Sequence, residues 1–178
     1  MDFTFPYDSP LGRITMGSDG DALIGLWFDG QKFDAAGLGE TRQEKHLPVF
    51  SETARWLDLY FSGKRPDFTP PLAPRGSEFR RAVWKLLLRI PYGETTTYGA
   101  LAAELAKARG IERMSARAVG GAVGHNPVSL IVPCHRVVGK DGRLTGYAGG
   151  LDRKKFLLDI EQRNAKTDLE DVPCWQKI

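Results

Sequence analysis

One short stretch, residues 125–138, concentrates the side chains that could do covalent chemistry. An apolar run ends at Pro133, and Cys134, His135 and Arg136 follow in succession. Cysteine attacks as a thiolate, and a nearby imidazole in cationic surroundings lowers the pKa of a thiol. The pattern indicates a nucleophile at Cys134, although a buried structural cysteine beside an incidental histidine would look the same.

Neighbouring residues point in different directions on either a strand or a helix, so Cys134 and His135 are not expected to touch. An ordered water between the thiol and the imidazole is the expected link. The histidine then needs a third group to fix its tautomer. Glu161 is the candidate, at the edge of the apolar face of a helix expected over residues 152–162 that buries Phe156, Leu157 and Ile160. The alternative is a frayed helix end with Glu161 in water.

Several helices are expected around this stretch. Ser77 is a plausible N-cap for a helix that runs to residue 90, where 91–93 stop it. Its apolar stripe consists of Phe79, Val83, Leu86, Leu87 and Ile90. Two shorter helices follow, over residues 97–106, closed by Gly110, and over 115–124. Their succession suggests a helix-turn-helix, although any pair of antiparallel helices gives a similar pattern.

The helix at 115–124 has an unusual composition for one that reads DNA. Ser115 can cap it, and Arg117 is its single large cation among residues with almost no side chain. Gly120 and Gly121 each lower helix propensity by roughly 1 kcal/mol relative to alanine. Either the helix packs closely against its own domain, or it approaches the backbone of a partner. A thin helix could enter a DNA minor groove, where Arg117 would insert among the bases.

The first third of the chain predicts a small antiparallel meander followed by a helix. The strands are expected over residues 3–7, 13–16 and 22–28, and the helix over 51–63, capped by Ser51. A proline-rich stretch at 66–74 reads as an extended linker. We therefore expect an α+β protein with an N-terminal α/β domain that contains an antiparallel sheet (residues 1–70) and a mainly helical C-terminal domain with the helix-turn-helix and the active site (residues 71–178).

Composition narrows the class of protein. The chain has 178 residues and is 42% hydrophobic, which excludes wholesale disorder, and no segment approaches the length of a membrane span. No signal peptide is visible, and two cysteines and three histidines make a disulfide scaffold or a four-ligand zinc site unexpected. The net charge is distributed unevenly along the chain: residues 1–73 carry −4, residues 74–155 carry +9 and residues 156–178 carry −2. The basic middle segment suggests nucleic acid as partner, or else a solvated basic face.

The motif at residues 133–137 resembles the active-site motif of the O6-alkylguanine-DNA alkyltransferases, also called methylated-DNA–protein-cysteine methyltransferases. The resemblance covers residues 74–162 strongly and 1–65 loosely. Further stretches in the family order lie at 79–84, 90–95, 98–99, 117–120, 126–127 and 146–150. Together these motifs are highly specific.

The resemblance implies a DNA repair protein that moves the alkyl group from O6-alkylguanine in DNA to its own cysteine, once and irreversibly, after base flipping. It implies no cofactor and no metal, and O4-alkylthymine is a second candidate substrate. By the resemblance, Cys134 is the acceptor, His135 the water-mediated base and Glu161 the carboxylate that orients it. Tyr98 would help to rotate the nucleotide and would bind the base. Asn126 would join the DNA-reading helix to the active-site segment.

The resemblance also implies how double-stranded DNA is held, through its minor groove. Arg117 would fill the gap left by the flipped nucleotide, with further contacts from Ser115, Ala118 and Gly120. In the base pocket, the carbonyls of Cys134 and Val137 would accept from the guanine amino group. Tyr147 would line the wall, and the N–H of Ala148, where some members have serine, would serve O6.

Residues 106–114 form a longer turn than is usual in the family. Lys107, Arg109 and Arg113 either add phosphate contacts or belong to a passive loop.

The protein is expected to act as a monomer, and cooperative assembly on DNA is left open. Its expected location is the cytoplasm of a prokaryote or the nucleus of a eukaryote. Cys174 lies near a polar tail and looks incidental.

Two other functions compete. A thiol hydrolase that uses Cys134, His135 and Glu161 would turn over many times, whereas an alkyltransferase reacts once per molecule. A non-catalytic binder or regulator of alkylated DNA would be favoured by a missing acceptor cysteine, but Cys134 is present.

Overall fold

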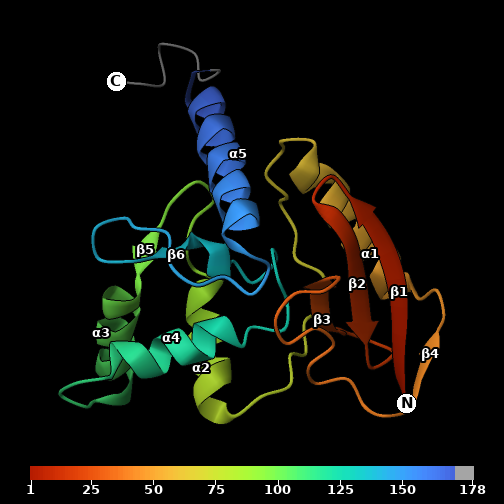
Figure 1. Cartoon of the computed structure of the whole chain (residues 1–178), viewed down its shortest axis with the longest axis horizontal. Helices are drawn as coiled ribbons and strands as arrows, with labels where there is room; N and C mark the ends of the chain where they lie inside the picture. Colours follow the sequence, from red (N-terminus) through yellow and green to blue (C-terminus); the bar gives the residue numbers. More distant parts are fainter. Residues whose placement is uncertain (171–178) are drawn as a thin grey trace.

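The computed structural model describes residues 1–170 and begins with a four-stranded sheet (Figure 1). Strands β1 (Asp2–Ser9), β2 (Gly12–Ser18) and β3 (Leu23–Phe28) form the antiparallel meander that the sequence predicts. A fourth strand, β4 (Arg42–Glu44), pairs in parallel with β1, so the sheet order is β3-β2-β1-β4. The sequence analysis missed β4 because its three residues are all exposed and show no apolar alternation.

Helix α1 (Pro48–Phe61) lies against this sheet (Figure 1). The predicted start at Ser51 is wrong, because the helix begins three residues earlier with Leu47 as its N-cap. Proline suits the first turn of a helix because its missing N–H would have no partner there, and the N-cap makes no side-chain hydrogen bond. The face of α1 turned to the core is formed by Val49, Phe50, Thr53, Trp56, Leu57 and Tyr60.

The proline-rich connection is extended, as predicted, but it is not free. It covers part of the outer edge of β3, where Leu23 donates to the Pro71 carbonyl at 2.8 Å and Ala73 donates back to Leu23 at 2.9 Å. Further along the same strand, Leu26 bonds in the same way to Pro127 and Ser129. The edge of the sheet is thus protected, and the chain leading to Cys134 is fixed to it. The hydrophobic core runs continuously across both parts, and the division at residue 70 stays a prediction.

The helical part opens with α2 (Glu78–Leu87), and its N-cap Ser77 accepts from the backbone N–H of Arg80 as expected. The helix ends three residues before the predicted residue 90, although Ile90 is still buried. Helix α3 (Tyr98–Arg109) is closed by Gly110 in the left-handed conformation, with φ of 63°. Helix α4 (Ala116–Gly124) is capped by Ser115 and packs against both α2 and α3. Helices α3 and α4 with the turn between them form the expected helix-turn-helix arrangement.

Two further elements frame the reactive stretch. The short strands β5 (Thr96–Thr97) and β6 (Val137–Val138) pair in parallel and join the start of α3 to the chain just after Cys134. Helix α5 (Leu151–Glu170) extends eight residues beyond the predicted end. No helix among residues 1–170 has both the length and the apolar character needed to span a lipid bilayer.

The buried face of α5 differs from the prediction. Phe156 is 43% exposed and Ile160 is only half-buried. The face turned inward carries Lys154, Leu157, Leu158 and Glu161 instead. Apolar periodicity misidentified this face because two of its members are charged residues, which are rarely buried without partners.

Candidate active site

Cys134 begins a single turn of 3-10 helix (Cys134–Arg136) and is almost fully buried. The chain reaches it through a tight bend in which Leu130 has a positive φ of 69° and Ile131 donates to the Ser129 carbonyl at 2.8 Å. Burial raises the pKa of the Cys134 thiol, although Asn126 and Lys154 act in the opposite direction. The resting thiol therefore keeps its proton near neutral pH and needs a base before it can act as a nucleophile.

His135 is completely buried, and its Nε2 lies 2.6 Å from Oε1 of Glu161. Burial lowers the pKa of His135, with the charges of Arg136 and Lys154 acting in the same direction and Glu161 opposing them. The neutral ring must donate from Nε2, because an ionised carboxylate only accepts. Nδ1 is then the basic nitrogen, and it is buried with no hydrogen-bond partner among the described residues.

Glu161 is the centre of a dense set of hydrogen bonds. It lies in the middle of α5, so the frayed end that the sequence left open does not occur. Arg136 donates to both oxygens, from Nε at 2.7 Å and from Nη2 at 3.0 Å, and the Gly93 N–H donates at 3.2 Å. Burial alone raises the pKa of Glu161, but His135 and Arg136 outweigh it and hold that pKa well below the usual range. The carboxylate is therefore ionised and can orient His135.

Asn126 stabilises the bend that leads to Cys134 through three hydrogen bonds. Its Nδ2 donates to the carbonyls of Val132 at 2.8 Å and Val128 at 3.2 Å, while its Oδ1 accepts from the Val128 N–H at 3.0 Å. In the sequence, Asn126 comes directly after His125, the C-cap residue of α4. Asn126 thus lies between the end of α4 and the chain that leads to Cys134.

Lys154, which was not among the predicted site residues, organises the other side of the site. Its ammonium group is buried and donates to the carbonyls of Val137 at 2.6 Å and Thr145 at 2.7 Å. Burial lowers the pKa of Lys154 to about 8, and the Cys134 charge opposes this. A signal was present, because Lys154 and Glu161 share one helical face with the buried leucines between them.

A cavity of about 600 Å³, called the mouth below, lies between α3, α4 and the 145–148 segment. It is lined by Tyr147, whose ring centroid lies 6.5 Å from that of His135, and not by Cys134 itself. The Tyr98 hydroxyl lies 3.4 Å from both the carbonyl and the hydroxyl of Thr145. Tyr147 packs over Gly149, where a Cβ would lie only 2.8 Å from the tyrosine ring. The N–H of Ala148 makes no hydrogen bond to any described residue, while its carbonyl accepts from Lys32 at 3.0 Å.

Two residues from the N-terminal sheet region also line this mouth, and the sequence analysis missed both. Phe33 has a positive φ of 61°, is 40% exposed and stacks on His125 with ring centroids 4.2 Å apart. The Lys32 ammonium lies 5.1 Å from the centre of the Phe33 ring. No alternation or charge pattern marks this loop, because its position depends on how the sheet packs against α4.

The outer face of α4 is open. Arg117, Ser115 and Ala118 are exposed, and Arg117 makes no ion pair with the described residues. A Cβ built on Gly121 or Gly124 would meet nothing within 4 Å, and one on Gly120 would make only ordinary contact with Tyr98. Packing within the chain therefore does not require these glycines.

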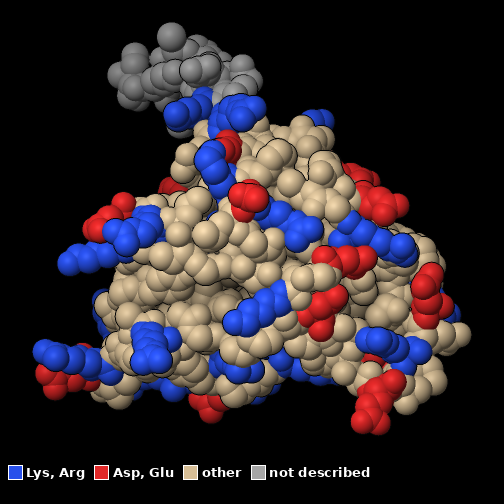
Figure 2. All heavy atoms as spheres, viewed as in Figure 1, with Lys and Arg blue, Asp and Glu red and all other residues tan. Residues whose placement is uncertain are grey.

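Basic residues surround this face. Lys and Arg side chains follow the lower edge of the view in Figure 2, over the region of α2, α3 and α4. The turn predicted over residues 106–114 is shorter in the structure, because residues 106–109 are the last residues of α3 and the chain leaves the helix at Gly110. Arg109, the last residue of α3, lies 3.7 Å from Glu78 and 5.6 Å from the Phe79 ring centre, so it is engaged with α2. Lys107 and Arg113 are exposed and have no ion-pair partner among the side chains that the structure describes, those of residues 1–166.

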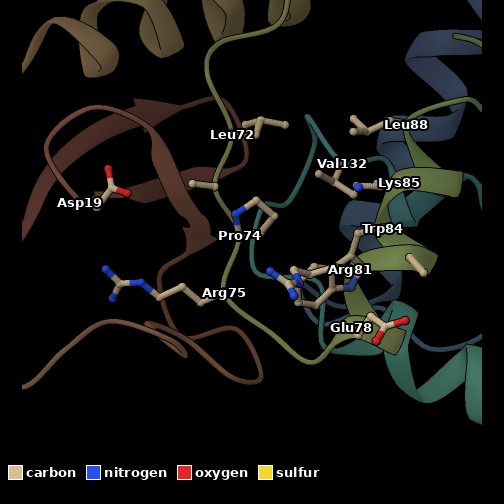
Figure 3. Close-up of a pocket in the computed structure, with 12 residues that line it drawn as sticks. Asp19, Leu72, Pro74, Arg75, Glu78, Arg81, Trp84, Lys85, Leu88 and Val132 are labelled. Carbon is tan, nitrogen blue, oxygen red and sulfur yellow. The ribbon is translucent and has the colours of Figure 1, made fainter.

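A larger cavity of about 840 Å³ lies elsewhere, between the extended connection and α2 (Figure 3). Leu72 and Pro74 line it on one side, and Arg81, Lys85 and Leu88 on the other. Val132, whose carbonyl accepts from the Cys134 N–H at 2.8 Å, lines this cavity, but Cys134, His135 and Glu161 do not. Cys174 lies outside the described residues.

Known proteins resemble the chain over nearly its whole length. The family model of the 6-O-methylguanine DNA methyltransferase DNA-binding domain matches residues 78–163, and that of the ribonuclease-like domain of the same family matches residues 6–74. A methylated-DNA–protein-cysteine methyltransferase of Methanosarcina mazei is 50% identical over 158 residues, covering 89% of this chain and 96% of the relative. That of Mycobacterium bovis is 43% identical over 162 residues, covering 91% and 93%.

Solved structures of proteins from the same family are also similar to this chain. The crystal structure of Mycobacterium tuberculosis O6-methylguanine methyltransferase is similar with a TM-score of 0.78 and 41% identity, covering 96% of this chain and 98% of that one. A crystal structure of the Mycobacterium tuberculosis protein in complex with DNA is similar with a TM-score of 0.76 and 40% identity, covering 92% and 93%. The chain therefore belongs to the 6-O-methylguanine DNA methyltransferase family.

Proposed function

We propose that the protein repairs DNA by transferring the alkyl group from O6 of an alkylated guanine to Sγ of Cys134, in one irreversible step per molecule. The observation that carries the proposal is the buried series Cys134, His135 and Glu161, in which an ionised carboxylate fixes a neutral imidazole beside a protonated thiol. The family to which the chain belongs supports the same reaction. O4-alkylthymine is a second candidate substrate.

The chemistry needs only this chain and the damaged base. His135 Nδ1 accepts the thiol proton through an ordered water, and Glu161 stabilises the imidazolium that forms. The thiolate attacks the alkyl carbon, so that an S–C bond forms while the C–O6 bond breaks and leaves its electron pair on guanine. Tyr98 supports the departing base with a hydrogen bond, and the base takes up a proton from water. His135 returns the thiol proton to water, and Cys134 is left as a thioether.

Recognition rests on α4 entering the minor groove of double-stranded DNA. The glycines on its outer face have open space around them and allow close approach of a sugar–phosphate backbone. Arg117 is exposed and without an ion-pair partner among the described residues, so it is available to fill the gap left by the flipped base. Flipping costs a few kcal/mol, which phosphate contacts from the basic segment can offset.

The base itself is held in the pocket beside Cys134. The carbonyls of Cys134 and Val137 accept from the guanine amino group, and Val137 uses its second lone pair because the first is taken by Lys154. The N–H of Ala148 donates a hydrogen bond to O6 of the base, and Tyr147 forms the wall of the pocket. We infer that a single chain is sufficient, acting where DNA is kept, in a prokaryotic cytoplasm or a eukaryotic nucleus.

Intact-protein mass spectrometry tests the proposal. After incubation with a duplex that contains O6-methylguanine, we expect one added methyl group on Cys134, with no turnover beyond one equivalent. Cys134→Ala should bind the duplex with similar affinity and gain no mass. Modification at Cys174, or repeated turnover as a thiol hydrolase would give, would overturn the assignment.

A further inference from the structure

Tyr60 connects the N-terminal part of the molecule to the reactive site. It lies in the last turn of α1, is completely buried, and its hydroxyl donates to Oε1 of Glu161 at 2.7 Å. Its ring is held by aromatic neighbours on several sides: it stacks on Trp56, with centroids 5.3 Å apart, and meets Tyr92 and His135 edge-on. The hydroxyl therefore has little freedom to move away from Glu161.

The direction of this hydrogen bond is set by its partner. Glu161 is ionised and can only accept, so Tyr60 must be the donor. Burial and the neighbouring Glu161 charge raise the pKa of Tyr60, which keeps its proton in place. A permanent neutral donor thus faces the same carboxylate oxygen that binds His135.

Tyr60 differs in origin from the other donors to Glu161. His135, Arg136 and Gly93 all follow the proline-rich connection, whereas Tyr60 precedes it. Among the described residues, it is the one side chain of the sheet-and-α1 region with a hydrogen bond to Glu161. The first part of the chain therefore reaches the site through this hydroxyl.

Resting on the proposed function, we propose that Tyr60 is a positioning residue for alkyl transfer, whose hydroxyl holds Glu161 in the orientation that fixes His135. The hydroxyl shares Oε1 with His135 Nε2, from which it lies 3.5 Å away. By stabilising charge on that oxygen, it weakens the attraction of the carboxylate for a proton on His135. Without it, Glu161 attracts that proton more strongly and is less firmly oriented.

The other charged and titratable groups around His135 stay constant when only the hydroxyl is removed. Arg136 and Lys154 oppose a proton on His135, and Glu161 favours one. Cys134, Tyr92 and Tyr147 complete the surroundings. Removal of the Tyr60 hydroxyl should therefore raise the pKa of His135, so that the neutral base appears only at higher pH.

The test is the single-turnover rate of methyl transfer from an O6-methylguanine duplex, measured from pH 5 to 9 for Tyr60→Phe. We expect the rate at pH 7.5 to fall roughly 10-fold, as for the loss of one hydrogen bond to a charged group. The acidic limb of the profile should shift to higher pH, while affinity for the duplex stays unchanged. A purely structural role would change thermal stability and leave the acidic limb in place.

Tyr7→Phe is the matched control. The Tyr7 hydroxyl donates to Asp58 on the same helix at 2.7 Å, so it is a tyrosine–carboxylate bond of equal length outside the site. We expect wild-type rates and an unshifted limb from this variant. Equal profiles for Tyr60→Phe and Tyr7→Phe would overturn the inference. If the wild-type protein transfers no methyl group, the proposed function itself fails.

A second variant covers the case in which Tyr60→Phe does not fold. Replacing Tyr60 with 3-fluorotyrosine keeps the ring and makes the hydroxyl a stronger donor, so the acidic limb should move to lower pH. No movement, or movement in the same direction as for phenylalanine, would contradict the positioning role.

Discussion

The reactive site and helix α4, the proposed DNA-binding helix, lie next to each other and are built in opposite ways. Around Cys134, His135 and Glu161 the polar groups are buried, and Glu161 alone receives hydrogen bonds from Tyr60, His135, Arg136 and Gly93. On α4, Arg117 is exposed and the glycines border open space. The fold has therefore fixed the polar groups around Cys134 in advance, whereas the outer face of α4 is open and, by the proposed function, is completed by DNA.

The strongest test of this contrast is Glu161→Gln. We expect transfer to slow by roughly 100-fold, and the free energy of unfolding to fall by about 3–5 kcal/mol, because the buried Arg136 loses its counter-charge. Single-turnover kinetics and urea unfolding measure the two effects. Asp159→Asn is the control on the same helix, since its pair with Lys155 is exposed. That change should cost under about 1 kcal/mol.

The stability effect of Glu161 also has a pH dependence. The pKa of Glu161 is lowered in the folded protein, so its stabilisation is complete above the unfolded value of about 4.3 and is lost as pH falls below it. The stability difference between wild type and Glu161→Gln should shrink in that acidic range. A difference that grows on acidification would contradict an ionised, hydrogen-bonded carboxylate.

Arg117→Ala tests the proposed role of the outer face of α4. We expect repair of duplex DNA to slow roughly 10- to 100-fold, because the extruded base loses the side chain that fills its place. Reaction with a free alkylguanine base should change little, and unfolding should stay within about 0.5 kcal/mol of wild type because the side chain is exposed. Equal losses on duplex and free base would argue against this role.

The smallest effect is expected at the end of α3, which carries Lys107, and in the turn that follows it, which carries Arg113. If Lys107 and Arg113 contact phosphates, replacing both with glutamine should lower the slope of log K against log salt by about 2. Arg109→Gln is the control, because Arg109 is engaged with Glu78 and Phe79. An unchanged slope for the double variant would identify the turn as passive.

Local sequence signals predicted much of the fold correctly. The meander, the caps at Ser77 and Ser115 and the stop at Gly110 follow from alternation, side-chain oxygens and a left-handed glycine. The strand β4 did not follow, because it depends on pairing with a distant strand. The start of α1 had a local signal in Pro48 that the choice of Ser51 as cap overlooked. Lys154 and Tyr60 were missed as site residues, since a lysine on a helix is usually solvated and a tyrosine in an apolar stripe is usually core.

By itself, the sequence predicted a nucleophile at Cys134 beside His135 and a helix of small residues with the single arginine Arg117, because these depend on residue type and short spacing. Only the tertiary structure decided which groups meet at Glu161. Four of them, Tyr60, Gly93, His135 and Arg136, lie 101, 68, 26 and 25 positions from it in the chain and are within 3.2 Å of it in space. The pKa values that govern the chemistry depend on that meeting and on burial, neither of which local periodicity encodes.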